Sequence, residues 1–508
     1  MSNLLNSLKS TSNKTLTENG AVAYSTTESN VVDFFAQAGA MRSRSEQDIV
    51  NLFNQSFNED RLITLKLAYH FRDIRKGQGE RRLFRVIIKY LAFQYPEIVI
   101  KNLIHIPFFG RWDDLFELFG TPCEKEMSAL VQEQFKTDCM TEFPSLLGKW
   151  LKSNNASSKA TKEIAYKLEK ILGLSPRQYR KALVMLRKRI GIVETLITKK
   201  RYADIDYSKV PSQANLKYMK AFWKNDEERY QEFIGQVKKG EKKINAKVLF
   251  PYEIVRKIVS DMYQFSSQTI DHQEDASLDV MWTSLPDYVG EDYSNTLAVI
   301  DGSGSMYCDS QRPISSAIAL GIYFAEKNKG LFHNHFITFS QNPQLIEIKG
   351  NNITEKVTNV TRYNEIANTN IEKVFDLILD KVIKNKLSQD DIPQRVVIIS
   401  DMEFDSATRS GGYGYGFSSS RNSVDMDSLF VTLKNRWSNK GFKMPLLTFW
   451  NVDARHESFP MSINETGIQF VSGNSPSIFT SILKNNFVTP LDLVHDVVDN
   501  ERYSIIQL

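Results

Sequence analysis

Hydrophobic residues recur at a helical spacing through the first half of the chain, from residue 31 to about residue 270. Two of the apolar faces consist of Leu62, Leu65, Leu67, Ala68 and Phe71, and of Leu83, Val86, Ile87, Tyr90 and Leu91. Short polar, proline or glycine breaks separate these segments, and none has the period-two alternation of a strand. The pattern predicts stacked helical hairpins, although no strict sequence period points to a known repeat family.

The second half of the chain alternates short apolar runs with amphipathic segments. The runs expected to form buried strands are residues 297–300, 332–339, 396–399, 445–452 and 468–471. The helices expected between and after them are residues 313–327, 371–384, 425–438 and 476–484. Alternation of this kind predicts an α/β domain with a doubly wound parallel sheet and right-handed crossovers.

A change of composition over residues 266–295 separates the two halves, because helical periodicity stops there and acidic residues, proline and glycine follow. We therefore expect a multidomain protein. Its expected parts are a flexible arm of residues 1–30, a helical-repeat domain of residues 31–285, an α/β domain of residues 292–486 and a C-terminal tail of residues 487–508 that packs back on the helical domain.

Polar side chains follow the strands of the predicted sheet. Asp301, Ser303 and Ser305 come directly after the first strand, within a glycine-rich turn that can curl. Thr369 precedes a later helix, and Asp401 ends the strand 396–399 with one serine between. Such a turn lies at the carboxyl edge of the sheet, where α/β folds bind ligands. Carboxylate and hydroxyl oxygens suit Mg²⁺ or a related hard cation. The alternative interpretation is an ordinary polar turn.

Two other interpretations of the turn fail on spacing. A phosphate-binding P-loop requires a lysine after its second glycine, and none is present. A nucleophile elbow requires glycine two residues before and after the serine, but Ser303 has Asp301 and Ser305 there.

The Asp-x-Ser-x-Ser pattern, with the later threonine and aspartate, resembles the metal-ion-dependent adhesion site of von Willebrand factor A domains. The resemblance implies that Asp301, Ser303, Ser305 and Thr369 bind Mg²⁺ or Mn²⁺, and that Asp401 acts through water. An open coordination position would then accept a carboxylate of a partner or a phosphate oxygen.

Two segments of the helical half carry a second resemblance. Residues 73–81, Asp-Ile-Arg-Lys-Gly-Gln-Gly-Glu-Arg, and residues 108–115, Phe-Phe-Gly-Arg-Trp-Asp-Asp-Leu, resemble parts of the TROVE module of the Ro ribonucleoprotein family. That family and its poorly characterised cousins join a HEAT-like helical domain to a von Willebrand A domain. The resemblance implies a ring or horseshoe that binds small or misfolded RNA on positive surfaces.

A basic segment of the helical half supports RNA contact from the residues themselves. Its cations are Arg177, Arg180, Lys181, Arg187, Lys188, Arg189, Lys199, Lys200 and Arg201. The nearby Tyr179, Tyr202 and Tyr207 could stack on bases. The alternative interpretation is a solvated helix face, because the same segment has an apolar side that can pack.

Composition adds few constraints. With 42% hydrophobic and 24% charged residues the chain is typical of soluble globular proteins, and a net charge of +4 does not by itself indicate a partner. Three cysteines without Cys-x-x-Cys spacing argue against structural zinc and disulfides. No apolar run reaches the ~20 residues that span a membrane. We expect a cytoplasmic monomer with no membrane contact.

The hypothesis from the sequence is a non-enzymatic RNA-binding protein with a metal site in its A domain. The first alternative is a metal-dependent adaptor that captures an acidic residue of a partner protein, including a MoxR-like ATPase. A metal-dependent hydrolase using Asp401 and Asp405 lacks an evident general base. The loop 409–421, with Tyr, Phe and Arg among glycines, is either a mobile stacking segment or an insertion without function.

Overall fold

The chain forms two compact units, and each combines segments that lie far apart in the sequence. The α/β unit consists of Met1–Thr64 and Phe250–Asn500, and the helical unit consists of Leu65–Leu249 and Glu501–Leu508. The computed structural model describes residues 13–17, 22–263, 272–290, 295–307, 313–340, 342–363, 370–404, 426–461, 467–484 and 489–508.

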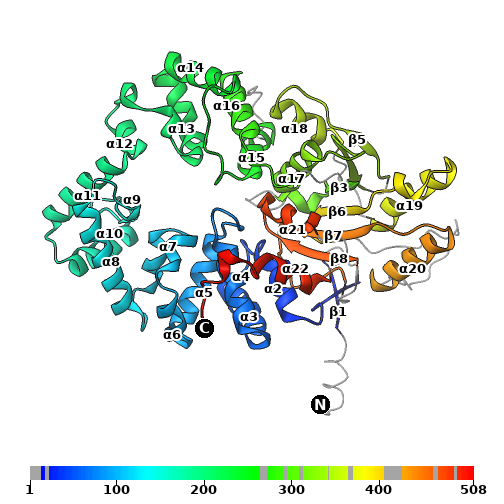
Figure 1. Ribbon diagram of the computed structural model, residues 1–508, viewed down its shortest axis with the longest axis horizontal. Helices are drawn as coiled ribbons and strands as arrows, with labels where there is room; N and C mark the ends of the chain where they lie inside the picture. The colour runs from blue at the N-terminus through cyan, green and yellow to red at the C-terminus, as the bar shows by residue number, and fades with distance from the viewer. Residues whose placement is uncertain are drawn as a thin grey trace, which may run out of the picture. The chain divides into compact units, whose positions relative to one another are not determined.

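The α/β unit is built on a six-stranded sheet in the order β5-β4-β3-β6-β7-β8 (Figure 1). The strands are β3 Thr296–Asp301, β4 His335–Phe339, β5 Leu345–Glu347, β6 Arg395–Ser400, β7 Leu446–Asn451 and β8 Ile468–Ser472. The prediction of an α/β fold is confirmed. The prediction of an all-parallel sheet is wrong at one edge, where β5 runs antiparallel to β4. The chain between Phe339 and Leu345 is too short for the crossover that parallel neighbours require.

Helices cover both faces of this sheet, as a doubly wound fold requires. The helices of the unit are α2 Asn30–Ala38, α3 Glu46–Glu59, α15 Pro251–Tyr263, α16 His272–Thr283, α17 Pro313–Lys327, α18 Ile353–Thr361, α19 Ile371–Lys384, α20 Met426–Asn439, α21 Phe479–Lys484 and α22 Pro490–Val498. Side chains of α2, α19 and α20 join one face of the sheet in a single apolar core. On the other face, Ile300 of β3 packs at Gly321 of α17, and Trp450 of β7 packs on Phe479 of α21.

Helix α17 is buried on all sides from Pro313 to Ala325, so its side away from the sheet also needs an apolar cover. Helices α15 and α18 pack against it, and Trp282 of α16 donates a hydrogen bond to Glu326 at 2.8 Å. The α/β unit therefore starts again at Phe250. The boundary predicted between residues 285 and 292 does not coincide with this division.

The start of the described chain also belongs to the α/β unit. Strands β1 Lys14–Leu16 and β2 Val22–Tyr24 form an antiparallel pair. Backbone groups of Tyr24 and Phe459 exchange hydrogen bonds of 2.9 and 2.8 Å, and the Tyr24 side chain is buried. The predicted flexible arm of residues 1–30 is thus wrong for these strands, because their backbone polar groups are paired with the rest of the unit.

The helical unit has no strand among its described residues, which confirms the predicted helical domain. Its elements are the main part of α4 Arg61–Arg72, then α5 Arg81–Gln94, α6 Pro96–Lys101, α7 His105–Phe109, the 3-10 helix Trp112–Leu118, α8 Glu124–Met140, α9 Leu147–Trp150, α10 Lys159–Leu172, α11 Pro176–Ile190, α12 Val193–Thr198, α13 Ser212–Asn225 and α14 Glu227–Lys238. The HEAT-like ring or horseshoe stays a prediction. Within the described ranges, we find no helix with the length and apolar character needed to cross a bilayer.

The predicted tail divides between the two units. Helix α22 packs on α2, α21 and β8 of the α/β unit. The last eight residues, Glu501–Leu508, belong instead to the helical unit. There Arg502 forms an ion pair with the buried Asp73, and Gln507 exchanges hydrogen bonds of 2.6 and 3.0 Å with Asn102. Only the final residues therefore return to the helices as the sequence predicted.

Candidate functional site

The predicted metal ligands among the described residues, Asp301, Ser303, Ser305 and Asp401, lie at the point of the sheet where its connections reverse direction. Strand β3 is flanked by β4 on one side and by β6 on the other, so crossovers leave β3 and β6 in opposite directions. Asp301 ends β3, and Asp401 follows the last residue of β6 directly. The register pairs Ile300 with Ile399, which sets the two carboxylates at one edge. Open α/β sheets bind ligands at such a switch point, outside the carboxyl ends of the strands.

Hydrogen bonds join Asp301 to its neighbours in the turn and on β6. Its Oδ1 accepts from the backbone N–H of Ser303 at 2.9 Å, and its Oδ2 accepts from the hydroxyl of Ser400 at 2.5 Å. The hydroxyl oxygens of Ser303 and Ser305 lie 3.1 Å apart. Three of the predicted ligands, Asp301, Ser303 and Ser305, thus form one small group of oxygen atoms. Sequence reasoning missed Ser400, although its position at the end of β6 was a usable signal.

Two buried carboxylates make this group electrostatically unusual. Burial and the nearby Asp401 raise the pKa of Asp301 to about 7, against the opposing hydrogen bonds from Ser400 and Ser303. Arg455, which follows β7, forms an ion pair with Asp401 at 2.6 Å. The sequence did not predict that Arg455 contacts Asp401, because this contact depends on the path of the chain after β7. A buried carboxylate beside two hydroxyls fits a hard cation, since a positive charge would offset the desolvation of Asp301.

The other predicted parts of this site are not placed. Thr369, Asp405 and the loop 409–421 lie outside the described residues, so their roles stay predictions. Within the ranges that are described, no group of three or more His, Cys, Asp or Glu side chains is arranged to hold a metal ion. The predicted donor set relies instead on hydroxyl oxygens and one carboxylate.

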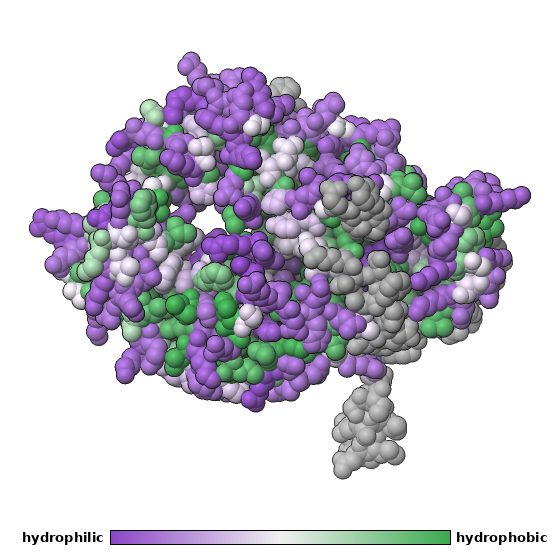
Figure 2. All heavy atoms as spheres, viewed as in Figure 1, coloured by the Kyte–Doolittle hydropathy of each residue, from purple (hydrophilic) through white to green (hydrophobic). Residues whose placement is uncertain are grey.

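The basic segment of the helical unit separates into an exposed face and a set of structural contacts. Arg177, Arg180, Lys181 and Lys188 are exposed and recur at helical spacing along one face of α11. Val184 stands between them with 62% of its surface exposed. In Figure 2, hydrophilic side chains project at the left edge of the view, where Figure 1 places α10 and α11. Lys199, Lys200 and Arg201 are also exposed, and Arg201 pairs with Asp204.

Two arginines of this segment hold the helices together. The Arg187 guanidinium donates to the carbonyls of Gly148 and Leu151 at 3.2 and 2.8 Å, and to the hydroxyl of Ser153 at 3.0 Å. Arg189 donates to the carbonyls of Cys139, in the last turn of α8, and of Thr141, directly after it. These contacts support a structural role for both side chains. The role predicted for them in RNA binding stays untested.

The prediction about the tyrosines near the basic segment is wrong for two of them. The ring of Tyr179 is fully buried, and its hydroxyl donates to the carbonyl of Lys152 at 2.8 Å. Tyr207 is buried among Phe222, Tyr230 and other rings. The prediction that these two side chains stack on bases is therefore wrong. The helical spacing of the sequence could not distinguish a core tyrosine from an exposed one.

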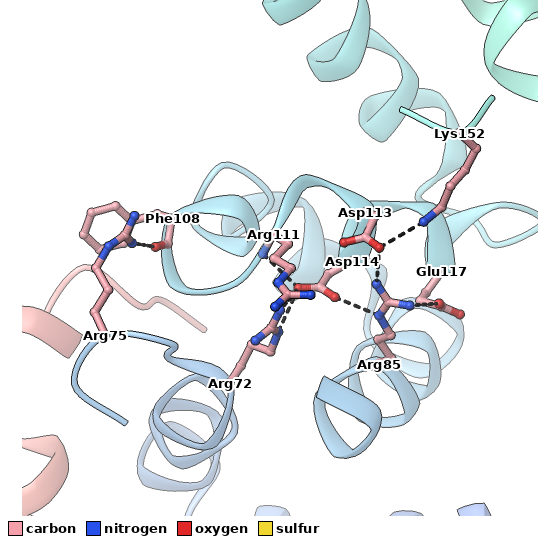
Figure 3. A network of polar contacts seen from close by, with 9 residues as sticks. All are labelled: Arg72, Arg75, Arg85, Phe108, Arg111, Asp113, Asp114, Glu117 and Lys152. Carbon is pink, nitrogen blue, oxygen red and sulfur yellow. Dashed lines mark hydrogen bonds and ion pairs between the residues drawn. The ribbon is translucent and has the colours of Figure 1, made fainter. Parts of the chain in front are cut away.

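The segment Phe108–Leu115 forms a buried ion network (Figure 3). Asp114 accepts from Arg72 and Arg85, both at 2.7 Å, and the backbone N–H of Arg111 donates to it at 2.9 Å. A side chain at Gly110 would clash with the carboxylate of Asp114 and the guanidinium of Arg72. The glycine of this motif is thus required by the close approach of Arg72 to Asp114.

Known proteins resemble this chain over most of its length. The family model described as Domain of unknown function (DUF2828) matches residues 17–140 and 134–292, and the model described as Domain of unknown function (DUF7788) matches residues 295–503. An uncharacterized protein, L728, of Acanthamoeba polyphaga mimivirus is 28% identical over 527 residues, covering 96% of this chain and 87% of that protein. The crystal structure of the Ro (RSR) protein of Deinococcus radiodurans is similar with a TM-score of 0.46 and 12% identity, over 90% of this chain and 99% of that one.

Proposed function

We propose a function from the premise that this chain belongs to the family described as Domain of unknown function (DUF2828). The protein is a non-enzymatic RNA-binding protein whose helical unit contacts the RNA backbone. Its α/β unit holds a divalent cation at the group formed by Asp301, Ser303 and Ser305. The observation that carries the RNA part is the exposed basic face of α11.

Helix α11 is suited to a polyanion. Its sequence, Pro176–Ile190, contains no acidic residue, and its apolar side, with Leu183 and Leu186, is buried. The exposed cations are therefore not neutralised within the helix, and they repeat along its length. Clustered cations bind phosphates without regard to base sequence and release the counterions that surround the RNA. The resemblance to the Ro family points to the same class of partner.

Reversing four charges on α11 tests this proposal. We expect the variant R177E/R180E/K181E/K188E to bind a single-stranded RNA roughly 100-fold more weakly than the wild type at low salt. The slope of log affinity against log salt should decrease in magnitude by about 3, because each phosphate contact on a single strand contributes about 0.7. Fluorescence anisotropy over a range of salt concentrations measures both quantities.

The matched control carries the same change of charge elsewhere in the helical unit. Lys238, Lys239, Lys242 and Lys243 are exposed, and one acidic residue, Glu241, lies between the two pairs. The variant K238E/K239E/K242E/K243E should retain most of the affinity and salt dependence. Equal losses in both variants would mean that only net charge matters, and an unchanged α11 variant would contradict the proposal.

The metal part of the proposal assigns Asp301, Ser303 and Ser305 as ligands, with Thr369 and Asp401 as further members of the site. A bound Mg²⁺ or Mn²⁺ would supply a positive charge, and an oxygen atom of a partner would coordinate the cation. In the protein itself, Ser400 orients the carboxylate of Asp301 through its hydrogen bond. Arg455 balances the charge of Asp401.

Manganese binding tests the metal part directly. We expect the wild type to bind Mn²⁺, and D301N to bind it at least tenfold more weakly, because the amide supplies no negative charge. Electron paramagnetic resonance of free Mn²⁺ measures the affinity. The control D380N removes an exposed carboxylate from α19 and should bind as the wild type does. Undiminished binding by D301N would exclude Asp301 as a ligand.

A further inference from the structure

Two large apolar side chains project into solvent where the chain passes from α8 to α9. Phe143 has 85% and Met140 has 87% of its surface exposed, more than any other large apolar side chain among the described residues. Burying a phenylalanine ring is favourable, so a ring left in solvent to this extent is costly to keep there. The ring of Phe143 is therefore available to a ligand.

Hydrogen bonds hold the loop of residues 141–146, which we call the Phe143 loop, in place. The buried carboxylate of Asp138 accepts from the backbone N–H of Ser145 at 2.9 Å and from its hydroxyl at 2.7 Å. The backbone N–H of Phe143 donates to the hydroxyl of Thr141 at 3.2 Å. Pro144 restricts the backbone of the preceding Phe143 to extended conformations. A ligand that contacts the ring therefore does not have to order the loop first, which lowers the entropic cost of binding.

The cationic end of α11 lies beside the Phe143 loop. The guanidinium of Arg189 donates to the carbonyls of Cys139 and Thr141 at 3.0 and 3.1 Å. Phe143 follows Thr141 by two residues, and two residues span at most about 7 Å. Arg189 belongs to the last turn of α11, and the exposed Lys188 precedes it directly. The ring of Phe143 is thus close to the end of the basic face on which the proposed function depends.

We propose that Phe143 stacks on an unpaired base of the RNA whose phosphates contact α11. Exposed aromatic rings beside cations are the combination that binds single strands, because the ring stacks on a base and the cations attract the backbone. Bases inside a duplex are already stacked on each other, so only a single-stranded segment can offer a base to the ring. Glu142 is the one acidic residue of the Phe143 loop, so the phosphates lie toward α11 and the base lies on the ring. The inference rests on the proposed function and narrows its substrate to single-stranded RNA.

Two oligomers of equal charge separate base contacts from phosphate contacts. The first is a short single-stranded oligoadenylate, and the second is an abasic ribose-phosphate oligomer of the same length. F143A removes the ring, and F143W replaces it with another aromatic side chain. F93A is the matched control, because Phe93 is an exposed phenylalanine on α5. Fluorescence anisotropy over a range of salt concentrations measures the affinity and the salt slope of each protein for each oligomer.

We expect F143A to bind the oligoadenylate roughly tenfold more weakly than the wild type does, because it loses one stacked base. Its salt slope should not change, because it loses no phosphate contact. Its affinity for the abasic oligomer should equal that of the wild type. F143W should keep the wild-type affinity for the oligoadenylate, and F93A should match the wild type with both oligomers.

Wild-type affinity of F143A for the oligoadenylate would overturn the stacking proposal alone. The RNA-binding function would then stand, and the exposed ring would be assigned to a protein partner instead. Equal losses of F143A with both oligomers would also overturn the proposal, because the ring would not act through a base. If the wild type binds neither oligomer, the proposed function fails and the stacking on RNA fails with it.

Discussion

Replacing Asp114 by asparagine is expected to lower the free energy of unfolding of the helical unit by about 3–5 kcal/mol, because it leaves a buried arginine without its counter-charge. Arg72 has 1% and Asp114 0% of its side chain exposed. Because the guanidinium of Arg72 is buried, it has little access to water once the carboxylate is gone. Arg85 also loses one of its two aspartate partners.

Urea denaturation measures this change, and hydrogen exchange of peptides from Leu65–Leu249 assigns it to the helical unit. The control is D204N, which removes the acid from the exposed ion pair with Arg201. That pair is in water, so its loss should cost less than about 1 kcal/mol. A similar small effect in D114N would mean that water or a neighbouring carboxylate replaces the lost charge.

Deleting Glu501–Leu508 is expected to destabilise the helical unit by at least about 5 kcal/mol. Tyr503 and Ile506 have only 2% and 3% of their surface exposed, so their apolar burial is lost. The hydroxyl of Tyr503 meets His70 Nδ1 at 3.1 Å, and its ring stacks on Phe109. Asp73, fully buried, loses the cation of Arg502.

Thermal melting with exchange readouts for each unit measures the result. The α/β unit should keep its protection, because α22 and its buried residues Leu493 and Val494 remain in the shortened chain. The variant S504A changes an exposed side chain within the same segment and should melt as the wild type does. If the shortened protein retains the exchange protection of Leu65–Leu249, the last eight residues do not stabilise the helices.

The predicted strands and the site at their ends followed from local features of the sequence. Strands buried on both faces need continuous apolar runs, and β3 and β6 have them immediately before Asp301 and Asp401. The antiparallel β5 was missed because its short sequence, Leu-Ile-Glu, has only one buried residue. Arg455 was missed because its partner, Asp401, lies 54 residues earlier in the chain.

By itself, the sequence determined the helical and α/β halves, the turn that brings Asp301, Ser303 and Ser305 together, and the basic composition of α11. These depend on periodicity and on residues close in the chain. Tertiary structure alone decided that α2, α15 and α16 complete the α/β unit. The apolar residues on all sides of α17 indicate that other helices must pack against it, but they do not indicate which segments of the chain these are. Tertiary structure also decided that Tyr179 is buried and that Arg72 and Asp114 form a buried ion pair. Both outcomes depend on which side chains meet across separate helices, and a single sequence does not encode those distances locally.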